Sequence, residues 1–245
     1  MKIGDIPKFI INLKRRPDRL ESIKKQMDYV GWEFEIFDAV DTNSYMGCAL
    51  SHLEILRIAK ERGYKKVMII EDDCFFMPYA KELIDDLNNV LPTLEYFYFN
   101  LSPTLNRHIN LSEISNYILD MKNLPEKQNP IFREIYATNM VIYDSLIYDE
   151  VFKIEKTKVG NGDFYYAIDV FIFDNIINKY PSYCPHIPLC CQGNDRSDVG
   201  NVIYDTFYTQ TYNWNSYSPC KIPTKFLNLT ENKQKINNKI YETIC

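Results

Sequence analysis

The protein is a chain of 245 residues, of which 46% are hydrophobic and 25% are charged, and its formal net charge is −5 at pH 7. This length and apolar content can bury a full core, so we expect one large folded domain rather than a disordered chain. The acidic balance and the lack of a long Lys or Arg block argue against nucleic acid and anionic membranes as main partners, because both bind basic surfaces.

Targeting signals are not evident in the sequence. The N-terminal residues contain no apolar segment long enough for a signal peptide, and no stretch approaches the roughly 20 apolar residues that span a bilayer. We therefore expect no membrane span and a cytoplasmic location, in the host cytoplasm if the chain is viral. The seven cysteines are an odd number without regular spacing, which favours reduced thiols over a disulfide framework or a zinc site made of paired CxxC clusters.

The first hundred residues alternate apolar runs with amphipathic segments. The apolar runs predict strands at 8–13, 32–37, 65–70 and 94–101. The segments between them predict helices that begin at Pro17, Gly47 and Pro78, the second of which ends before Gly63. This alternation predicts an α/β fold with a mainly parallel central sheet, helices on both faces, and ligands at the carboxyl ends of the strands.

The second half of the chain is less regular. Residues 102–133 are polar and rich in loop formers, whereas 136–143 predict a strand and 163–177 a buried helix. Residues 182–192 predict an extended segment interrupted by prolines. We expect a single domain over residues 1–205, followed by a wrapping segment at 206–245 to which no function is assigned.

Three acidic residues follow the predicted central strand: Glu71, Asp72 and Asp73. Because side chains alternate along a strand, we expect Glu71 and Asp73 to project together while Asp72 points away or caps the next turn. Divalent cations such as Mg²⁺ and Mn²⁺ take oxygen ligands and bridge carboxylates to substrate phosphates. The pattern therefore indicates a metal site that holds a diphosphate.

Two alternatives account for the same acidic residues. They can form a solvated loop, since acidic side chains are common after strands. A phosphoacceptor domain of the receiver type also gathers acidic residues at strand ends, but it requires an Asp after the next strand. Here that strand ends in Asn100, and the chain is too long for such a domain.

Five stretches, in order and approximate spacing, resemble glycosyltransferase family 25, which includes lipooligosaccharide galactosyltransferases and the collagen galactosyltransferase. They are INLKRRPDRLESI (11–23), FDAVD (37–41), GCALSHLEILRIA (47–59), VMIIEDDC (67–74) and SDVG (197–200). The resemblance covers residues 8–200, and its most specific parts are GCALSH and the acidic motif taken together. It implies a GT-A fold over 1–205 that binds Mn²⁺ or Mg²⁺. It also implies inverting transfer of galactose or glucose from a UDP-sugar to a hydroxyl of a glycan, a lipid-linked saccharide or a glycoprotein.

The resemblance assigns donor-binding roles within residues 1–101, the expected nucleotide half. The implied contacts to uracil, ribose or diphosphate come from Asn12, Leu13, Arg19, Asp38, Val40, Ser51, His52 and Asp72. Several of these residue types have ordinary structural roles. Asp38 is also a turn former, and a histidine beside an apolar helix stripe, as His52 is, can be a buried structural group.

Residues 102–205 are the expected acceptor and sugar half. An inverting transfer needs a general base, and Asp169 lies alone in an apolar run where burial would raise its pKa. The resemblance assigns Asp169 this role, although a buried structural aspartate is the alternative. It also implies that Gln192, Ser197 and Asp198 bind donor hydroxyls and that His186 completes the metal site of Glu71 and Asp73.

Two departures leave the acceptor open: the spacing in CCQGNDRSD (190–198) is irregular, and Asn139 stands where family members usually have an aromatic or glycine-rich stretch. A non-catalytic module that binds a nucleotide sugar or a glycan is the competing function. The intact acidic motif argues against it.

Overall fold

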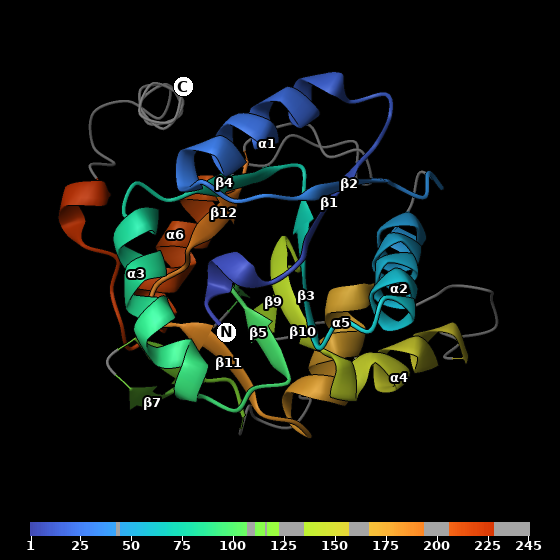
Figure 1. Ribbon diagram of the computed structural model, residues 1–245. Coiled ribbons are helices and arrows are strands. Elements are labelled where there is room, and N and C mark those ends of the chain that lie inside the picture. Colours follow the sequence, from blue (N-terminus) through green and yellow to red (C-terminus); the bar gives the residue numbers. More distant parts are fainter. Residues whose placement is uncertain are drawn as a thin grey trace.

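The computed structural model describes residues 1–42, 45–106, 111–115, 117–122, 135–156, 167–193 and 206–227. Its centre is an eight-stranded sheet with the strand order β2-β1-β3-β10-β5-β11-β8-β7 (Figure 1). These strands are β1 (Lys8–Asn12), β2 (Glu35–Asp38), β3 (Lys66–Glu71), β5 (Tyr98–Asn100), β7 (Ser112–Ser115), β8 (Ile118–Asp120), β10 (Met140–Asp144) and β11 (Ser182–Pro185). The α/β fold with a large central sheet flanked by helices is thereby confirmed.

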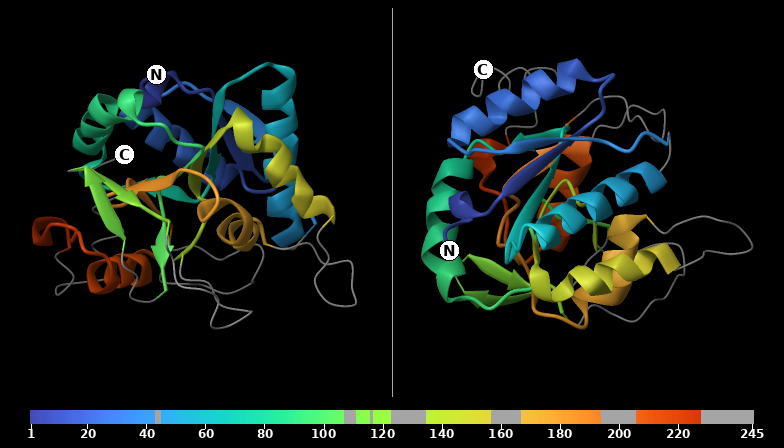
Figure 2. Two further views of the ribbon diagram at one scale, coloured as in Figure 1. Left: turned by 90° about the horizontal axis from the view of Figure 1, so that it is seen from below. Right: turned by 45° about the vertical axis from the view of Figure 1, so that its right-hand side comes forward.

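Two small two-stranded sheets and the helices complete the described fold. The small sheets are β4 (Cys74–Phe76) with β12 (Cys190–Gln192), and β6 (Thr104–Leu105) with β9 (Ile135–Tyr136). The helices are α1 (Pro17–Val30), α2 (Tyr45–Glu61), α3 (Ala80–Val90), α4 (Tyr148–Val151), α5 (Ile168–Ile172), which continues as a π-helical turn, and α6 (Thr206–Tyr217). In Figures 1 and 2, α2, α4 and α5 lie together on one side of the sheet, while α1 and α3 lie on the other.

The N-terminal units form as their sequence patterns predict. Strand β1 pairs in parallel with both β2 and β3, with α1 and α2 as the connections. Helix α1 begins at Pro17 and ends at Gly31, which adopts a left-handed conformation with a φ of 69°. Gly63 has a φ of 68° just beyond α2. Both glycines thus occupy the backbone region that ends a helix at the lowest steric cost.

The central sheet is mixed rather than mainly parallel, because four of its seven strand pairs are antiparallel. Strand β10 makes two of these pairs, since it enters the sheet between β3 and β5. It runs antiparallel to both neighbours, with Val141 opposite Ile69 on one side and Asn100 on the other. Its residues from Met140 to Tyr143 are buried, as a strand paired on both edges requires. Since its N-terminal end meets the carboxyl end of β3, residues 137–139 lie beside the acidic motif.

Two strands are shorter than the apolar runs predict. The run at 32–37 becomes strand only from Glu35, because Trp32 turns into the core and meets Phe76 edge-on with ring centroids 5.5 Å apart. The run at 94–101 becomes strand only from Tyr98, since a 3-10 turn at Leu91–Thr93 extends the end of α3. Large apolar side chains therefore did not fix where these strands begin, and in β2 they did not predict burial either, since Ile36 is 43% exposed.

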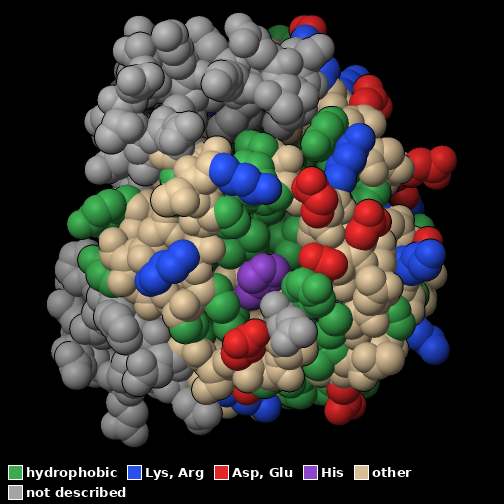
Figure 3. Space-filling model, turned by 90° about the vertical axis from the view of Figure 1, so that its left-hand side faces the viewer, with side chains coloured by type: hydrophobic (Ala, Val, Ile, Leu, Met, Phe, Trp, Pro, Cys, Tyr) green, Lys and Arg blue, Asp and Glu red, His purple; other side chains and the backbone are tan. Residues whose placement is uncertain are grey.

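Charged side chains are dispersed over the visible surface. On the face that carries α3, Figure 3 shows Lys and Arg side chains standing apart from one another among acidic and uncharged groups. They form no continuous basic surface on the described part of that face. Among the described helices, none has both the length and the apolar content needed to cross a membrane.

The described part of the C-terminal segment packs into the core of the protein and hydrogen-bonds to it. Helix α6 packs on β6 and β12, and its Trp214 is fully buried in the main hydrophobic core. Gln210 on the same helix accepts a hydrogen bond from the Gln192 backbone N–H (3.2 Å) and donates to the Ser102 carbonyl oxygen (3.3 Å). The rest of the expected wrapping segment, residues 228–245, lies outside the described residues.

We predict that Trp214→Ala destabilises the protein by about 3–5 kcal/mol, because it removes a large side chain from a closely packed core. Chemical denaturation followed by far-UV circular dichroism measures this difference. Tyr212→Ala on the same helix is the control, since Tyr212 is 53% exposed and its replacement should change stability by only about 0.5 kcal/mol. Equal losses for the two variants would show that α6 does not share the core.

Candidate functional site

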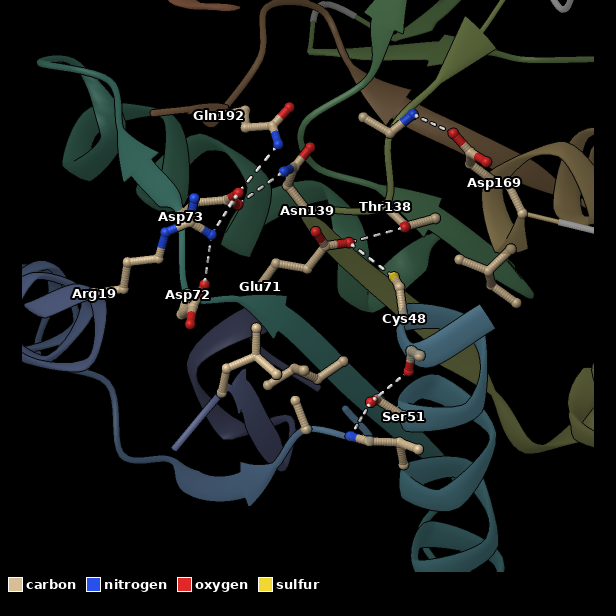
Figure 4. A pocket seen from close by; sticks show the side chains of 18 of the residues that line it. Arg19, Cys48, Ser51, Glu71, Asp72, Asp73, Thr138, Asn139, Asp169 and Gln192 are labelled. Atoms are coloured by element: carbon tan, nitrogen blue, oxygen red, sulfur yellow. Dashed lines mark hydrogen bonds and ion pairs between the residues drawn. The ribbon is translucent and has the colours of Figure 1, made fainter. Parts of the chain in front are cut away.

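A cavity of about 350 Å³ opens at the carboxyl ends of β1 and β3, the location predicted from the strand and helix order (Figure 4). Three further segments close around it: the loop after β2 with the start of α2, residues 136–139 before β10, and the start of α5. Gln192 at the end of β12 also lines it. Segments from both halves of the chain therefore meet at one site.

Arg19 links two of the acidic side chains. Its Nη1 lies 3.2 Å from Asp72 Oδ1 and 3.2 Å from Asp73 Oδ2, so one guanidinium serves both carboxylates. Asn12 Nδ2 donates to the other Asp72 oxygen at 2.6 Å. The end of β1 and the first turn of α1 thus hold Asp72 in place.

Asp73 receives further hydrogen bonds from the second half of the chain. Gln192 Nε2 donates to Asp73 Oδ2 at 3.1 Å, and Asn139 Nδ2 donates to Asp73 Oδ1 at 3.3 Å (Figure 4). The Gly193 backbone N–H also donates to the Asp73 carbonyl oxygen at 2.7 Å. Asp73 is consequently the residue at which β3, β10 and β12 are tied together.

Glu71 points toward a different set of groups. Its Oε1 accepts a hydrogen bond from Thr138 Oγ1 at 3.1 Å and from Cys48 Sγ at 3.7 Å, and His52 Nε2 lies 3.8 Å away. Glu71 and Asp73 therefore do not project together from one face of a strand, contrary to the expectation from the sequence. Strand β3 ends at Glu71, and the next two residues form a turn, so the alternation of a strand does not extend to Asp73.

Burial and mutual repulsion shift the pKa values of these acids. Burial, and then the charge of Asp73, raise the pKa of Asp72 to about 6. Burial and the charge of Glu71 also raise the pKa of Asp73. Burial alone would raise the pKa of Glu71, but His52, Thr138 and Cys48 together lower it.

The described residues that line the cavity carry an excess of negative charge. Five are acidic, namely Asp41, Glu71, Asp72, Asp73 and Asp169, against the two cations Arg15 and Arg19. Arg15 is paired with Asp41 at the rim. Because carboxylates in a partly buried site repel one another strongly, this set of oxygen donors fits a hard divalent cation.

Hydrogen bonds between the Ser51 side chain and two backbone groups hold the loop after β2 against α2. Ser51 Oγ accepts from the Val40 N–H at 2.9 Å and donates to the Gly47 carbonyl oxygen at 2.7 Å. A Cβ atom on Gly47 would lie 2.4 Å from the Val40 carbonyl oxygen, so a side chain at this position would push the loop after β2 away from α2. Leu13 and Val40 both line the cavity.

Asp169 lies in the first turn of α5 and lines the cavity opposite α1 (Figure 4). Its Oδ1 accepts a hydrogen bond from the Val170 N–H at 2.8 Å, and its Oδ2 from the Ala137 N–H at 3.4 Å. Burial raises the pKa of Asp169 above its ordinary value. Ala137 has a φ of 73°, a conformation uncommon for a residue with a side chain, and Asn100 Nδ2 donates to its carbonyl oxygen at 2.8 Å.

Several residues predicted for the site lie elsewhere or outside the description. Asp38 is exposed and pairs with Lys14 at 2.9 Å rather than lining the cavity. His186 lies beyond β11, where its Nδ1 is 3.3 Å from the Tyr117 carbonyl oxygen, and the structure does not bring it to Glu71 and Asp73. His52 is fully buried behind the cavity wall. Ser197 and Asp198 lie outside the described residues.

Three site residues received no role from the sequence: Cys48, Thr138 and Asn139. Cys48 could have been predicted at the site, because it belongs to the GCALSH stretch at the start of α2, which the resemblance places near the nucleotide. Thr138 and Asn139 reach the site only because β10 pairs antiparallel with β3, where the Glu71 N–H donates to the Asn139 carbonyl oxygen at 2.8 Å. No local pattern in the sequence predicts the pairing of β10 with β3.

Comparison with known families identifies one match. The model of "Glycosyltransferase family 25 (LPS biosynthesis protein)" matches residues 5–45 and 42–143. These two segments contain β1, β2, β3 and β10, together with the acidic motif and the start of α2.

Among curated proteins, the chain is 33% identical over 103 residues to a "Glycosyltransferase 25 family member" of Drosophila melanogaster, covering 30% of this chain and 17% of that protein. It is 32% identical over 110 residues to a putative glycosyltransferase of Acanthamoeba polyphaga mimivirus, covering 35% and 33%. The matched part thus spans a third or less of the length of these relatives.

Among solved structures, the chain is similar to a glycosyltransferase involved in the glycosylation of the major capsid of PBCV-1, with a TM-score of 0.44 and 8% identity. The alignment covers 73% of this chain and 80% of that one.

We predict that Asp72→Asn stabilises the metal-free protein at pH 7. The pKa of Asp72 in the folded state, about 6, exceeds its ordinary value of 3.8. Its contribution to stability is therefore fully present below pH 4 and is lost as the pH rises through about 6. The variant should be more stable at pH 7 by on the order of 1–3 kcal/mol, and the difference should shrink as the pH falls toward 4.

Urea unfolding in EDTA across this pH range measures the effect. Asp149→Asn is the control, because Asp149 is an exposed partner of Lys60 and such pairs contribute only about 0–1 kcal/mol. A wild-type protein that gains stability over Asp72→Asn as the pH rises would show that Arg19 outweighs the burial of Asp72.

Proposed function

Because the chain belongs to glycosyltransferase family 25, we propose that it transfers galactose or glucose from a UDP-sugar to an acceptor hydroxyl, with inversion and with the help of Mn²⁺ or Mg²⁺. The observation that carries this proposal is the cavity at the carboxyl ends of β1 and β3, where five acidic side chains meet two arginines. The α/β fold of the protein, with a large central sheet flanked by helices, is of the GT-A type expected for such an enzyme.

The acidic motif would hold the cation. Asp72 and Asp73, with Glu71 beside them, supply the hard oxygen donors that Mn²⁺ and Mg²⁺ require. When bound, the ion supplies charge stabilisation to the diphosphate leaving group. The cluster of buried carboxylates with raised pKa values supports this role, because binding a dication relieves their mutual repulsion.

The nucleotide would lie along the loop after β2. Leu13 and Val40 offer apolar contact there, while the Ser51 hydroxyl fixes the Val40 backbone and with it the wall of the cavity. Arg19 lies within reach of the same volume as the acidic motif. This arrangement would place uracil or ribose against the loop and the diphosphate toward Asp72 and Asp73.

Asp169 is the residue we assign as the general base. Its two backbone hydrogen bonds hold the carboxylate at the cavity wall, and a carboxylate retains further lone pairs that can accept a proton. Burial raises its pKa toward the range in which a carboxylate is an effective base. The acceptor hydroxyl would give its proton to Asp169 as it attacks the anomeric carbon from the side opposite to UDP.

We predict that Asp73→Asn abolishes the Mn²⁺-dependent binding of UDP. The substitution removes a negative charge from the proposed metal site while keeping a side chain that can still pair with Gln192. Thermal shift with UDP, with and without Mn²⁺, measures the binding, because a ligand selective for the folded state raises the melting temperature. Asp149→Asn should retain the full shift, and an undiminished shift in Asp73→Asn would exclude this residue as a ligand.

We predict that Asp169→Asn retains Mn²⁺-dependent UDP binding but loses turnover by a factor of about 10²–10⁴, the usual contribution of a general base. Release of UDP from UDP-galactose and UDP-glucose in the presence of Mn²⁺ measures the activity of the full chain, since many transferases also hydrolyse their donor slowly.

The same assay separates the proposed enzyme from a non-catalytic module that binds a nucleotide sugar or a glycan. A wild-type protein that binds UDP with Mn²⁺ but releases none from either donor, even with acceptors added, is such a module. Wild-type turnover in Asp169→Asn would remove Asp169 from the role of base while leaving the metal assignment intact.

A further inference from the structure

A thiol, an imidazole and a carboxylate converge behind the acidic motif. Cys48 and His52 lie one turn apart on the same face of α2. Glu71 at the end of β3 points toward Cys48 (Figure 4). The Cys48 Sγ lies 3.7 Å and the His52 Nε2 lies 3.8 Å from Glu71 Oε1. All three donor atoms lie within 4.8 Å of one another.

The imidazole of His52 is oriented into this cluster. Its Nδ1 lies 3.2 Å from the Tyr143 hydroxyl, and the two rings meet edge-on. His52 is fully buried, yet its Nε2 has no hydrogen-bond partner among the described residues. A buried polar atom without a partner costs about 1–3 kcal/mol, so a ligand for this nitrogen would remove a specific penalty.

We propose that Cys48, His52 and Glu71 form a binding site for a borderline-soft divalent cation of the Zn²⁺ class. Tetrahedral zinc sites with bonds of about 2.0–2.3 Å keep their donor atoms about 3.3–3.8 Å apart. Two of the three distances between donor atoms, 3.7 and 3.8 Å, fall at the upper end of this range. The third, between Cys48 Sγ and His52 Nε2, is at most 4.8 Å, so binding requires the donor atoms to draw closer together.

The fourth ligand position faces the cavity. Cys48 and Glu71 both line the cavity, whereas His52 lies behind them. Three protein ligands and one position open to water is the arrangement of zinc sites that remain accessible to small molecules. A cation can therefore reach Cys48 and Glu71 from the cavity.

Charge balance also favours occupation. Binding displaces the proton of the Cys48 thiol, so that one thiolate, one carboxylate and a neutral imidazole surround a dication and the cluster becomes neutral.

This site differs in chemistry from the oxygen donors of Asp72 and Asp73. Thiolate and imidazole ligands favour Zn²⁺ and related metals, whereas carboxylates alone favour Mg²⁺ and Mn²⁺. Glu71 is close to both sets. In terms of the proposed function, a Zn²⁺ ion in the cluster would take Glu71 away from the acidic motif and lower Mn²⁺-dependent turnover.

Co²⁺ is the probe for the binding test, because a thiolate ligand gives it a charge-transfer absorption and a tetrahedral site gives intense visible bands. Titration of the reduced full-length protein should show both features at one equivalent, and Zn²⁺ should displace them while millimolar Mg²⁺ should not. The measurement needs neither UDP nor a sugar, so its result does not depend on the proposed function.

Variants identify the ligands. Cys48→Ser should lose the charge-transfer band, and His52→Gln should weaken Co²⁺ binding by about tenfold to a hundredfold or more. Cys220→Ser, which alters a half-buried cysteine away from the cluster, should leave the spectrum unchanged. The melting temperature of each variant without metal establishes that it is folded.

Two results would overturn the proposal. One is the absence of a thiolate band in the wild-type protein at Co²⁺ concentrations that saturate binding. The other is a band that persists in folded Cys48→Ser, which would assign it to another cysteine. A protein that passes the cobalt test but shows no transferase activity would retain the metal site and lose only the proposed function.

Discussion

The site depends on compensation of negative charge at the end of a buried strand. Three carboxylates lie at the end of β3 and in the turn that follows it, in a partly buried medium where like charges repel strongly. One guanidinium, that of Arg19, bridges two of them. The remaining partners are neutral donors on other segments, such as Asn12, Asn139 and Gln192. The fold therefore stabilises these acids through hydrogen bonds rather than through an equal number of positive charges. The cavity keeps an excess of negative charge that a cation can balance.

The antiparallel strand β10 makes this arrangement possible. An entirely parallel sheet would place only the loops after β1, β2 and β3 at the carboxyl ends of the strands. Because β10 runs the other way between β3 and β5, the segment that precedes it arrives at the same edge. That segment supplies Thr138 to Glu71, Asn139 to Asp73, and the Ala137 N–H to Asp169. One strand thus connects the proposed metal-binding and base-bearing sides of the cavity.

Much of the N-terminal fold could be predicted from the sequence because its signals are local. Continuous apolar runs marked β1 and β3, Pro17 and Gly63 marked a helix start and a helix end, and the acidic motif marked the correct edge of the sheet. Asp169 was likewise found from a single charge in an apolar run, and it lies at the cavity. The roles given to these residues remain predictions.

The remainder depended on contacts between residues far apart in the chain. The alternation of side chains in a strand could not reveal that β3 ends at Glu71, which sends Glu71 toward α2 and Asp73 toward β12. A histidine in an extended segment gave no indication that His186 would meet Tyr117 rather than the acidic motif. Asp38 was expected to face a ribose, but the end of an edge strand leaves it at the surface with Lys14.

The amide of Gln210 has a consequence for how the protein matures. It joins α6 to Ser102 and to the backbone of Gln192, whose own side chain holds Asp73. During synthesis the acidic motif leaves the ribosome long before α6 does, so the brace behind Gln192 is missing until α6 has been made. A nascent polypeptide should therefore acquire a fully supported cavity only late in translation.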